Sequence, residues 1–322
     1  KKHTKQFEVK DETRQIEYVN FDASPSMEDS ATLRATLNVL KEEFATTTDD
    51  KSFTERNASE MPFYASYLSK SAIKQQIKDS LFNMPVGGVY GPYLDGPNYV
   101  IAKIAGVKQW PDSAKVRHIL VATYQQDPQS GQSFRIRQDE DAEKRLDSAI
   151  AEIKAGKSFD SVCAKYSDDG TKNTGGVYEN FPTGQMVESF NEFAFDGAIG
   201  ERKIVKTSYG MHYVEVLGHT GSQPAYKIAY LSKPILASQE TINAANTAAI
   251  QFASSSKNKA QFDTNVAKLK MQPVTLPGIK ENDFKVGDIA DSRELVRWIY
   301  NNDPGDISVP FTIGDKNIVA II

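Results

Sequence analysis

Residues 86–104 read VGGVYGPYLDGPNYVIAKI, and residues 303–322 read DPGDISVPFTIGDKNIVAII. A related stretch, DGAIGERKIVKTSYGMHYVEVL, occupies residues 196–217. All three contain a glycine turn, a short strand-like run, a polar turn and then a run of alternating apolar residues. This pattern is typical of a β-hairpin, so we expect the chain to build one kind of hairpin three times.

Three glycines mark the register of this repeat: Gly88, Gly200 and Gly305. Their spacings, 200 minus 88 and 305 minus 200, are 112 and 105 residues. A period of this length corresponds to a domain, whereas the repeats of solenoid proteins are shorter. The sequence therefore predicts tandem domains.

The three repeats also open in the same way. Each starts with a strand-like run, at 15–21, 116–123 and 226–232, and continues with a helical stretch that begins near Thr32, Glu140 or Ile242. Turn-forming residues at 109–114 and 218–225 are the expected boundaries. The sequence thus predicts an α+β protein with three tandem domains, 1–109, 110–222 and 223–322, each a small, mainly antiparallel sheet packed by helices.

The composition argues against several classes of protein. The 322 residues carry a formal net charge of −4, which is unsuited to general nucleic-acid binding because phosphate contacts need a basic surface. No run of 18 apolar residues occurs, so no membrane-spanning helix is expected. The single cysteine, Cys163, excludes an internal disulfide, and its helical spacing from Phe159 and Tyr166 predicts a core thiol. Because the chain starts at Lys1, we expect any signal peptide or anchor to lie outside it.

Two of the four histidines occupy matching places in the second repeat. His118 lies in its first strand-like run and His212 in its last, each on the apolar face of its strand. If these strands are neighbours, the imidazoles can meet. Two structural histidines in the core would give the same pattern. A metal site lacks a third ligand at motif spacing, and a serine hydrolase lacks the GxSxG motif.

Four motifs of the second repeat follow one another in order: VRHILV, GKSFDSVCAKYSDD, TGGVYENFPTGQMVESFNEFAF and GERKIVKTSYGMHYVEV. Over residues 114–217 they resemble a parvulin-type peptidyl-prolyl isomerase. The arrangement of the whole chain is similar to that of the multi-domain parvulins of the bacterial cell envelope, which are periplasmic folding factors. The resemblance implies a peptidyl-prolyl cis/trans isomerase that uses neither a metal nor a cofactor.

The resemblance also implies which residues form the site. The expected catalytic residues are His118, Asp169, Thr207 and His212, where Thr207 hydrogen-bonds within the histidine network. The expected substrate-binding residues are Met186, Phe190, Tyr178, Phe181 and Tyr209. Among these, Met186 and Phe190 match the apolar floor that holds the proline ring, and Tyr209 lies near the rim of the pocket.

One motif departs from the family pattern. The family usually has Gly-Gly-Asp-Leu-Gly-x-Phe where residues 175–181 read GGVYENF. Tyr178 thus replaces a leucine that lines the pocket, and Glu179 replaces a glycine. We expect a changed pocket width and local backbone, modest activity, and an altered preference around the proline.

Some parvulins use basic residues after the first strand to select a phosphorylated residue before proline. Arg135 and Arg137 stand in the corresponding loop, but acidic residues surround them, and a solvated loop is expected instead.

The expected partners are unfolded or extended polypeptides that contain proline, and the expected location is the periplasm or an equivalent envelope space. Neither outer repeat carries histidines at the places of His118 and His212. We therefore expect the outer repeats to be degenerate parvulin-like domains with a chaperone-like role. A non-catalytic chaperone or scaffold built from all three domains is the alternative.

Overall fold

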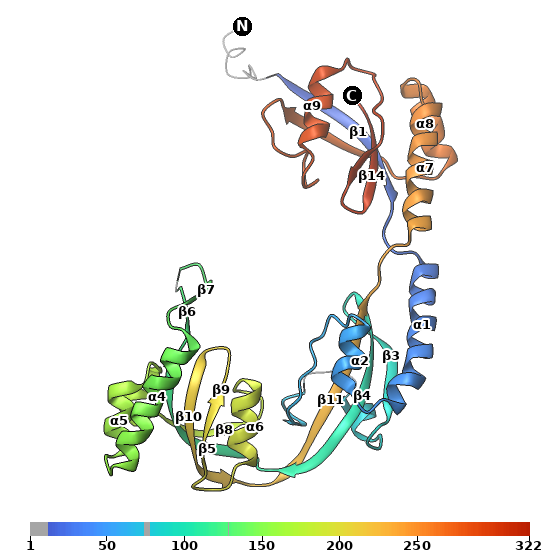
Figure 1. Cartoon of the computed structure of the whole chain (residues 1–322). Helices are drawn as coiled ribbons and strands as arrows, with labels where there is room; N and C mark the ends of the chain where they lie inside the picture. Colours follow the sequence, from blue (N-terminus) through green and yellow to red (C-terminus); the bar gives the residue numbers. More distant parts are fainter. Residues whose placement is uncertain (1–11, 74–77, 128) are drawn as a thin grey trace, which may run out of the picture. The chain divides into compact units, whose positions relative to one another are not determined.

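The computed structural model describes residues 12–73, 78–127 and 129–322 (Figure 1). Helices and antiparallel sheets are combined, as expected for an α+β protein. The chain divides into two compact units. The first joins the N-terminal residues, up to Thr36, to Ile235–Ile322, and the second comprises Leu37–Pro234. Among the helices of the described ranges, none is long and apolar enough to cross a bilayer.

The first unit contains a four-stranded sheet in the order β12-β1-β14-β13. Its strands are β1 (Thr13–Asp22), β12 (Val274–Lys280), β13 (Phe311–Ile313) and β14 (Lys316–Ile321). Its helices are α7 (Gln239–Ser255), α8 (Lys259–Lys268) and α9 (Arg293–Asn301). Side chains alternate across β1, so Val19 packs with α7 and α8 on one face while Tyr18 packs with α9 on the other.

The second unit contains two four-stranded sheets, of which the first has the order β2-β11-β4-β3. Its strands are β2 (Leu68–Ser69), β3 (Val89–Asp95), β4 (Asn98–Trp110) and β11 (Gln223–Pro234). The helices near it are α1 (Met27–Thr46), whose second half belongs to this unit, α2 (Asp50–Arg56) and α3 (Lys78–Phe82). Lys103 of β4 is buried and forms an ion pair with Asp50 at 2.7 Å. The attraction between the two charges offsets the free-energy cost of removing them from water.

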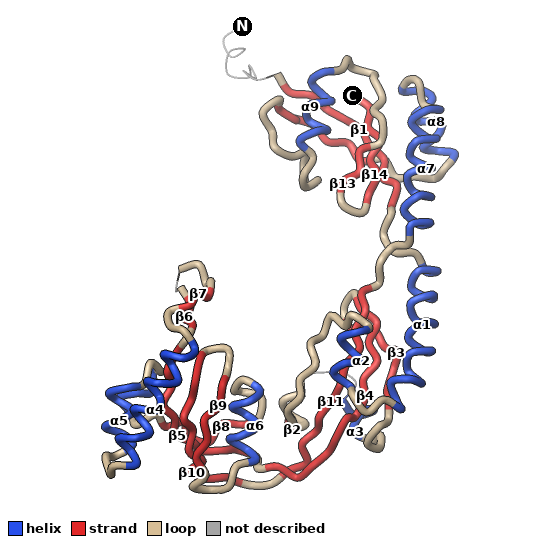
Figure 2. The backbone as a smooth tube through the Cα atoms, viewed as in Figure 1, coloured by secondary structure: helices blue, strands red, loops and turns tan. Residues whose placement is uncertain are grey.

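The other sheet of this unit has the order β8-β5-β10-β9 and carries the motifs of the second repeat (Figure 2). Its strands are β5 (Ser113–Ala122), β8 (Val177–Pro182), β9 (Arg202–Lys206) and β10 (Gly210–Thr220). Its helices are α4 (Asp139–Lys154), α5 (Phe159–Tyr166) and α6 (Glu188–Asp196), and a short hairpin of β6 (Tyr124–Gln126) and β7 (Ser133–Arg135) precedes α4. Ile119 and Tyr213 face α4 and α5, whereas Val116 and Val214 face α6.

The three four-stranded sheets share one strand order: an edge strand, a strand that opens a repeat, the last strand of a hairpin and the first strand of that hairpin. In the middle sheet all four strands come from one continuous segment. In the other two, the opening strands are exchanged: β1 pairs with β14 of the third repeat, and β11 pairs with β4 of the first. Three consecutive domains with boundaries at 109 and 222 are therefore not confirmed. The apolar patterns of β1 and β11 are so similar that sequence does not indicate which hairpin each strand joins.

The glycine register needs one correction. Gly200 and Gly305 each donate their backbone N–H to the last strand of their hairpin, to Val216 at 2.7 Å and Ile322 at 2.8 Å. In the first repeat Gly87, and not Gly88, makes this bond, to Ile104 at 2.8 Å. Gly87 also shares the left-handed backbone of the other two, with φ of 86°. Because Gly87 and Gly88 are adjacent, the sequence alone did not show which of them corresponds to Gly200 and Gly305.

The predicted boundaries at 109–114 and 218–225 are not loose linkers. The pairing of β4 with β11 extends to Trp110 opposite Gln223, and the pairing of β5 with β10 begins at Ser113 opposite Thr220. Within the second unit, the middle sheet is therefore joined to its neighbour by two antiparallel strand segments that run side by side (Figure 1).

Candidate active site

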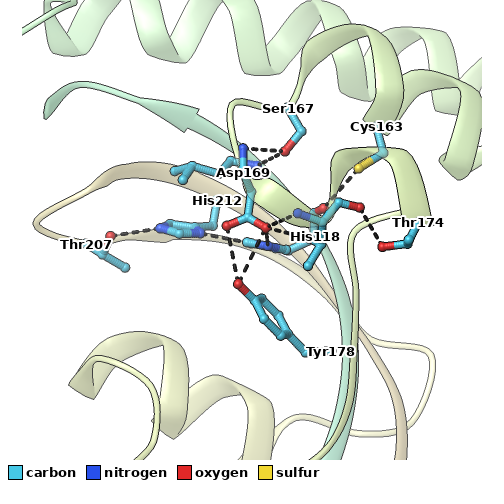
Figure 3. A network of polar contacts seen from close by, with 10 residues as sticks. His118, Cys163, Ser167, Asp169, Thr174, Tyr178, Thr207 and His212 are labelled. Atoms are coloured by element: carbon cyan, nitrogen blue, oxygen red, sulfur yellow. Dashed lines mark hydrogen bonds and ion pairs between the residues drawn. The ribbon is translucent and has the colours of Figure 1, made fainter. Parts of the chain in front are cut away.

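The two histidines of the middle sheet meet, as their strand positions predicted. His118 lies on β5 and His212 on the adjacent strand β10, where they occupy diagonal positions on the face toward α6. Their Nδ1 atoms are 3.1 Å apart (Figure 3). The exposed fractions of the two residues are only 2% and 5%, so this contact is shielded from water.

A chain of polar contacts extends from this pair in both directions. Oγ1 of Thr207 lies 2.8 Å from Nε2 of His212 and already accepts the Tyr209 amide at 3.1 Å. At the other end, Nε2 of His118 lies 3.4 Å from Oδ1 of Asp169. Figure 3 shows Thr207, His212, His118 and Asp169 in this order.

The network assigns the tautomers of both rings. The Asp169 carboxylate can only accept, so the proton of His118 lies on Nε2, which faces it, and Nδ1 of His118 is an acceptor. Nδ1 of His212 therefore donates to Nδ1 of His118, and Nε2 of His212 accepts from the Thr207 hydroxyl. The reverse assignment would place the Nε2 lone pair of His118 against a carboxylate. Nε2 of His118 has no hydrogen bond of normal geometry to any of the described residues.

The charges of the site follow from burial and these contacts. Burial alone would raise the pKa of Asp169, but the nearby Nε2 of His118 and the hydrogen bonds from Thr171 outweigh it and hold that pKa well below its ordinary value. Burial and the neighbouring His118 lower the pKa of His212 to about 3. Burial and the adjacent Asp169 raise the pKa of Tyr178 to about 12. At neutral pH the site therefore contains an anionic Asp169, a neutral His212 and a protonated Tyr178.

An apolar cavity of about 260 Å³ opens beside the histidine pair. It is lined by His118, Leu120, Asp169, Tyr178, Gln185, Met186, Val187, Phe190, Tyr209 and His212. The ring of Phe190 stands edge-on to both imidazoles, with centroid distances of 5.4 Å. The structure thus places an apolar floor and a hydrogen-bonded polar wall on the same small cavity.

Two predicted site residues do not line this cavity. Thr207 supports His212 through its hydrogen bond. Phe181, predicted to bind substrate, is 3% exposed and packs in the core against Phe190 and Phe195. Alternation alone would point Tyr178 and Phe181 to opposite sides of β8, but the irregular pairing of β5 with β8 brings both to the same cluster, where Phe181 fills the core.

Sequence reasoning missed three lining residues, Leu120, Gln185 and Val187. The sequence did contain the information needed to find them. Leu120 follows His118 by two residues on the same strand, and Gln185 and Val187 are the neighbours of Met186. It also missed the hydroxyl of Tyr178, which donates to Oδ2 of Asp169 at 3.3 Å. The replacement of the family leucine therefore adds a donor to the polar wall as well as changing its width.

The backbone of GGVYENF is accommodated in two ways. Gly176 has φ of 72°, and a Cβ atom there would lie 2.0 Å from the carbonyl oxygen of His118, so only glycine fits against β5. Glu179 replaces the family glycine without strain, because the left-handed position falls on the next residue, Asn180, with φ of 26°. Asparagine tolerates this region better than most residues. Glu179 itself pairs with Lys115 at 2.9 Å.

A larger cavity, of about 880 Å³, adjoins the first. Both are lined by Leu120 and Tyr209, and Tyr209 is 52% exposed between them. The hairpin of β6 and β7 contributes further lining residues, including Tyr124 and Ser133.

Other candidate groups have structural roles. Cys163 is fully buried, its thiol donates to the carbonyl oxygen of His118 at 3.4 Å, and burial raises its pKa, which confirms a core thiol. Arg137 pairs with Asp168 at 2.8 Å and Arg135 with Asp139 at 3.4 Å, so both guanidinium groups already have anionic partners. Throughout the described part of the chain, no cluster of three His, Cys, Asp or Glu side chains could hold a metal ion.

Comparison with known proteins identifies the domain. Residues 99–220 match the family model of the PPIC-type PPIASE domain. The chain is 29% identical over 148 residues to chaperone SurA of Pseudomonas savastanoi pv. phaseolicola, with 44% of this chain and 32% of the relative aligned. It is 39% identical over 80 residues to foldase protein PrsA of Caldanaerobacter subterraneus subsp. tengcongensis, with 24% of this chain and 26% of the relative aligned.

Chaperone SurA of Pseudomonas syringae pv. tomato is 32% identical over 149 residues, which cover 44% of this chain and 32% of that protein. The chain therefore spans about a third of the length of these relatives, or less. The matched family range contains the paired histidines, Asp169 and the apolar cavity. Residues 99–220 form a PPIC-type, or parvulin-type, peptidyl-prolyl cis/trans isomerase domain.

Proposed function

We propose that the middle domain isomerises X-Pro bonds in unfolded or extended polypeptides. The observation that supports this most directly is the ordered chain Thr207, His212, His118 and Asp169 beside a small apolar cavity. Met186 and Phe190 form a seat of suitable character for a pyrrolidine ring. The larger adjoining cavity accommodates the flanking residues of a bound chain.

The reaction needs no covalent step. Rotation about the X-Pro bond must overcome amide resonance, a barrier of roughly 18 to 20 kcal/mol. Resonance gives the planar carbonyl oxygen a partial negative charge, which falls as the bond twists. A pocket that removes water from this oxygen and faces it with the anionic Asp169 destabilises the planar amide relative to the twisted one.

The histidine pair would orient the reacting bond. His212 is neutral and fixed in one tautomer by Thr207, so it adds no charge that would stabilise the planar amide. The Nε2 proton of His118 faces Asp169 and holds the carboxylate in place. A rate gain of about 10⁴ requires the barrier to fall by about 5.5 kcal/mol.

The test is cis/trans exchange of X-Pro peptides measured by NMR with the full chain. We expect the parent protein to accelerate exchange, and His118→Ala and Met186→Ala to lose most of the acceleration while retaining the parent circular dichroism spectrum. A folded parent protein that does not accelerate exchange on any X-Pro peptide would rule out the enzymatic proposal.

A second, non-catalytic role is proposed for the outer sheets. Their shared strand order supports two parvulin-like folds that have exchanged opening strands. Tyr18 opposite Ala320, and Tyr230 opposite Ala102, stand where His118 stands opposite Val214. Neither outer sheet therefore has the histidine pair.

Exposed apolar side chains favour a chaperone-like role for the outer sheets. In the first unit Met27 is 91% exposed and Phe284 is 85% exposed. Relatives of the chain carry the names chaperone SurA and foldase protein PrsA. Suppression of aggregation by a His118→Ala variant that lacks isomerase activity would support this role, and no suppression would exclude it.

The periplasmic or envelope location remains part of the proposal and rests on the resemblance to multi-domain envelope parvulins. Fractionation of cells that produce the natural full-length protein would decide it.

A further inference from the structure

The isomerase domain is contacted by a segment that the family range does not include. Residues 64–69, here called the bracing segment, precede the matched range 99–220 by 30 residues or more along the chain. The segment ends in β2, which pairs with β11 of the neighbouring sheet. At its end the backbone N–H of Ser69 donates to Oγ1 of Thr183 at 2.8 Å, in a buried contact.

A buried asparagine makes the second link. Asn191 of α6 has no exposed surface. Its Oδ1 accepts the backbone N–H of Gly184 at 2.8 Å, and its Nδ2 donates to Oγ of Ser66 at 3.3 Å. One side chain thus ties the loop between β8 and α6 to α6 itself and to the bracing segment.

The same loop packs closely against the segment. Gly184 has φ of 81°, and a Cβ atom there would lie 2.7 Å from Cδ2 of Leu68. Nearby, Tyr67 packs edge-on to Trp110, with a centroid distance of 5.5 Å. Polar and apolar contacts therefore reach residues 183 and 184 from outside the domain.

This loop carries the floor of the cavity. Gln185, Met186 and Val187 follow Gly184 directly, and Phe190 lies one turn into α6. We propose that the bracing segment is a positioning element for the prolyl pocket: through Thr183 and Asn191 it holds the loop that places Met186. The inference rests on the proposed isomerase function and adds that the loop carrying Met186 is held from outside the matched range, by the bracing segment.

The test uses the full chain and changes one hydroxyl. Thr183→Val keeps the shape of the side chain but removes the acceptor for the Ser69 amide. We expect KM for an X-Pro peptide to rise about threefold to tenfold, as loss of one buried hydrogen bond produces, while kcat stays within about twofold. Thr183→Ser restores the hydroxyl and is expected to return KM to the parent value.

A matched control comes from the exposed side of α6. Ser189 is exposed, and its hydroxyl donates to the carbonyl oxygen of Lys206 at 2.8 Å instead of to the bracing segment. Ser189→Ala is expected to leave KM unchanged. A purely structural role for Thr183 would lower the unfolding midpoint without moving KM, or would move KM equally in the valine and serine variants, and either result would overturn the proposal.

A second readout separates this inference from the isomerase proposal. The methyl signal of Met186, assigned with Met186→Leu, reports peptide binding by NMR whether or not turnover occurs. If the parent protein binds an X-Pro peptide without isomerising it, the proposed function fails. A weaker affinity in Thr183→Val than in Thr183→Ser would then still support the bracing role, and equal affinities would refute it.

Discussion

Lowering the pH should destabilise the middle domain through His212. The pKa of this side chain falls from 6.5 to about 3 in the folded chain, because burial and His118 disfavour its charged form. In the unfolded chain it accepts a proton below about pH 6.5. The unfolded state then binds more protons than the folded state, so stability is fully present above pH 6.5 and is lost as the pH falls toward 3.

The magnitude follows from the width of this window. Well below the unfolded pKa, each pH unit costs about 1.36 kcal/mol per proton. Because His212 of the unfolded chain is already half protonated at pH 6.5, a change from pH 6.5 to 4.5 should remove about 2.3 kcal/mol from the free energy of unfolding. Stopping at pH 4.5 limits the contribution of the carboxylates, including Asp169. This loss is a large part of the stability of an ordinary domain, about 5 to 15 kcal/mol.

Urea unfolding provides the assay. The chain has two tryptophans, and in a Trp298→Phe background only Trp110, which packs against Phe195 near the middle sheet, reports by fluorescence. His212→Gln removes the titrating group and should flatten the pH dependence by the predicted amount. Parallel pH profiles for the two proteins, or a His212 ring signal that titrates above about pH 5 in the folded state by NMR, would refute the reasoning.

Three further changes test other parts of the structure. Thr207→Val removes the donor that fixes the His212 tautomer and should lower kcat/KM about twofold to tenfold in the NMR exchange assay; an unchanged value would contradict the tautomer assignment. Tyr178→Leu removes a ring and a hydroxyl from the wall of the cavity. It should raise kcat/KM for peptides with a bulky residue before proline, relative to peptides with alanine there. If the ratio of kcat/KM between variant and parent is the same for every peptide of the series, Tyr178 does not set the width of the cavity. Val19→Asp buries an unpaired carboxylate in β1 at a cost of about 3 to 5 kcal/mol, so Trp298 fluorescence should shift to the red while isomerase activity persists; loss of both together would mean that the two units do not unfold separately.

Local patterns predicted the elements and much of the site. Alternation placed His118 and His212 on inward faces, but whether their strands are neighbours was left as a condition that the pairing of β5 with β10 fulfils. The resemblance of GQMVESF to the parvulin motif, rather than a local pattern, predicted that Met186 and Phe190 belong to the same site as the histidines. These features depend on residues that are near in sequence or on a pattern that recurs three times.

Other features depend on long-range choices that no local pattern encodes. The apolar patterns of β1 and β11 are alike, so the sequence did not predict that β1 pairs with β14 and that β11 pairs with β4. The hydrogen bond from Tyr178 to Asp169 depends on the close packing of β8 and the loop after α5. The inward turn of Phe181 into the core depends on an irregular strand pairing. The sequence did not predict the role of Asn191, because the hydrogen-bond partners of an asparagine in an apolar helix depend on the tertiary structure.

The exchanged strands determine the order in which the chain can fold during synthesis. Glu17 pairs with Ile321, so the sheet that contains β1 cannot close until the last residues of this chain have been made. The middle sheet lies wholly within residues 113–220 and can close much earlier. Until β12 and then β14 have been made, the apolar side chains of β1 have no partner strand, and such an unpaired strand is prone to aggregate. A chain that resembles chaperones thus contains a strand that is itself open to aggregation while the chain is being made.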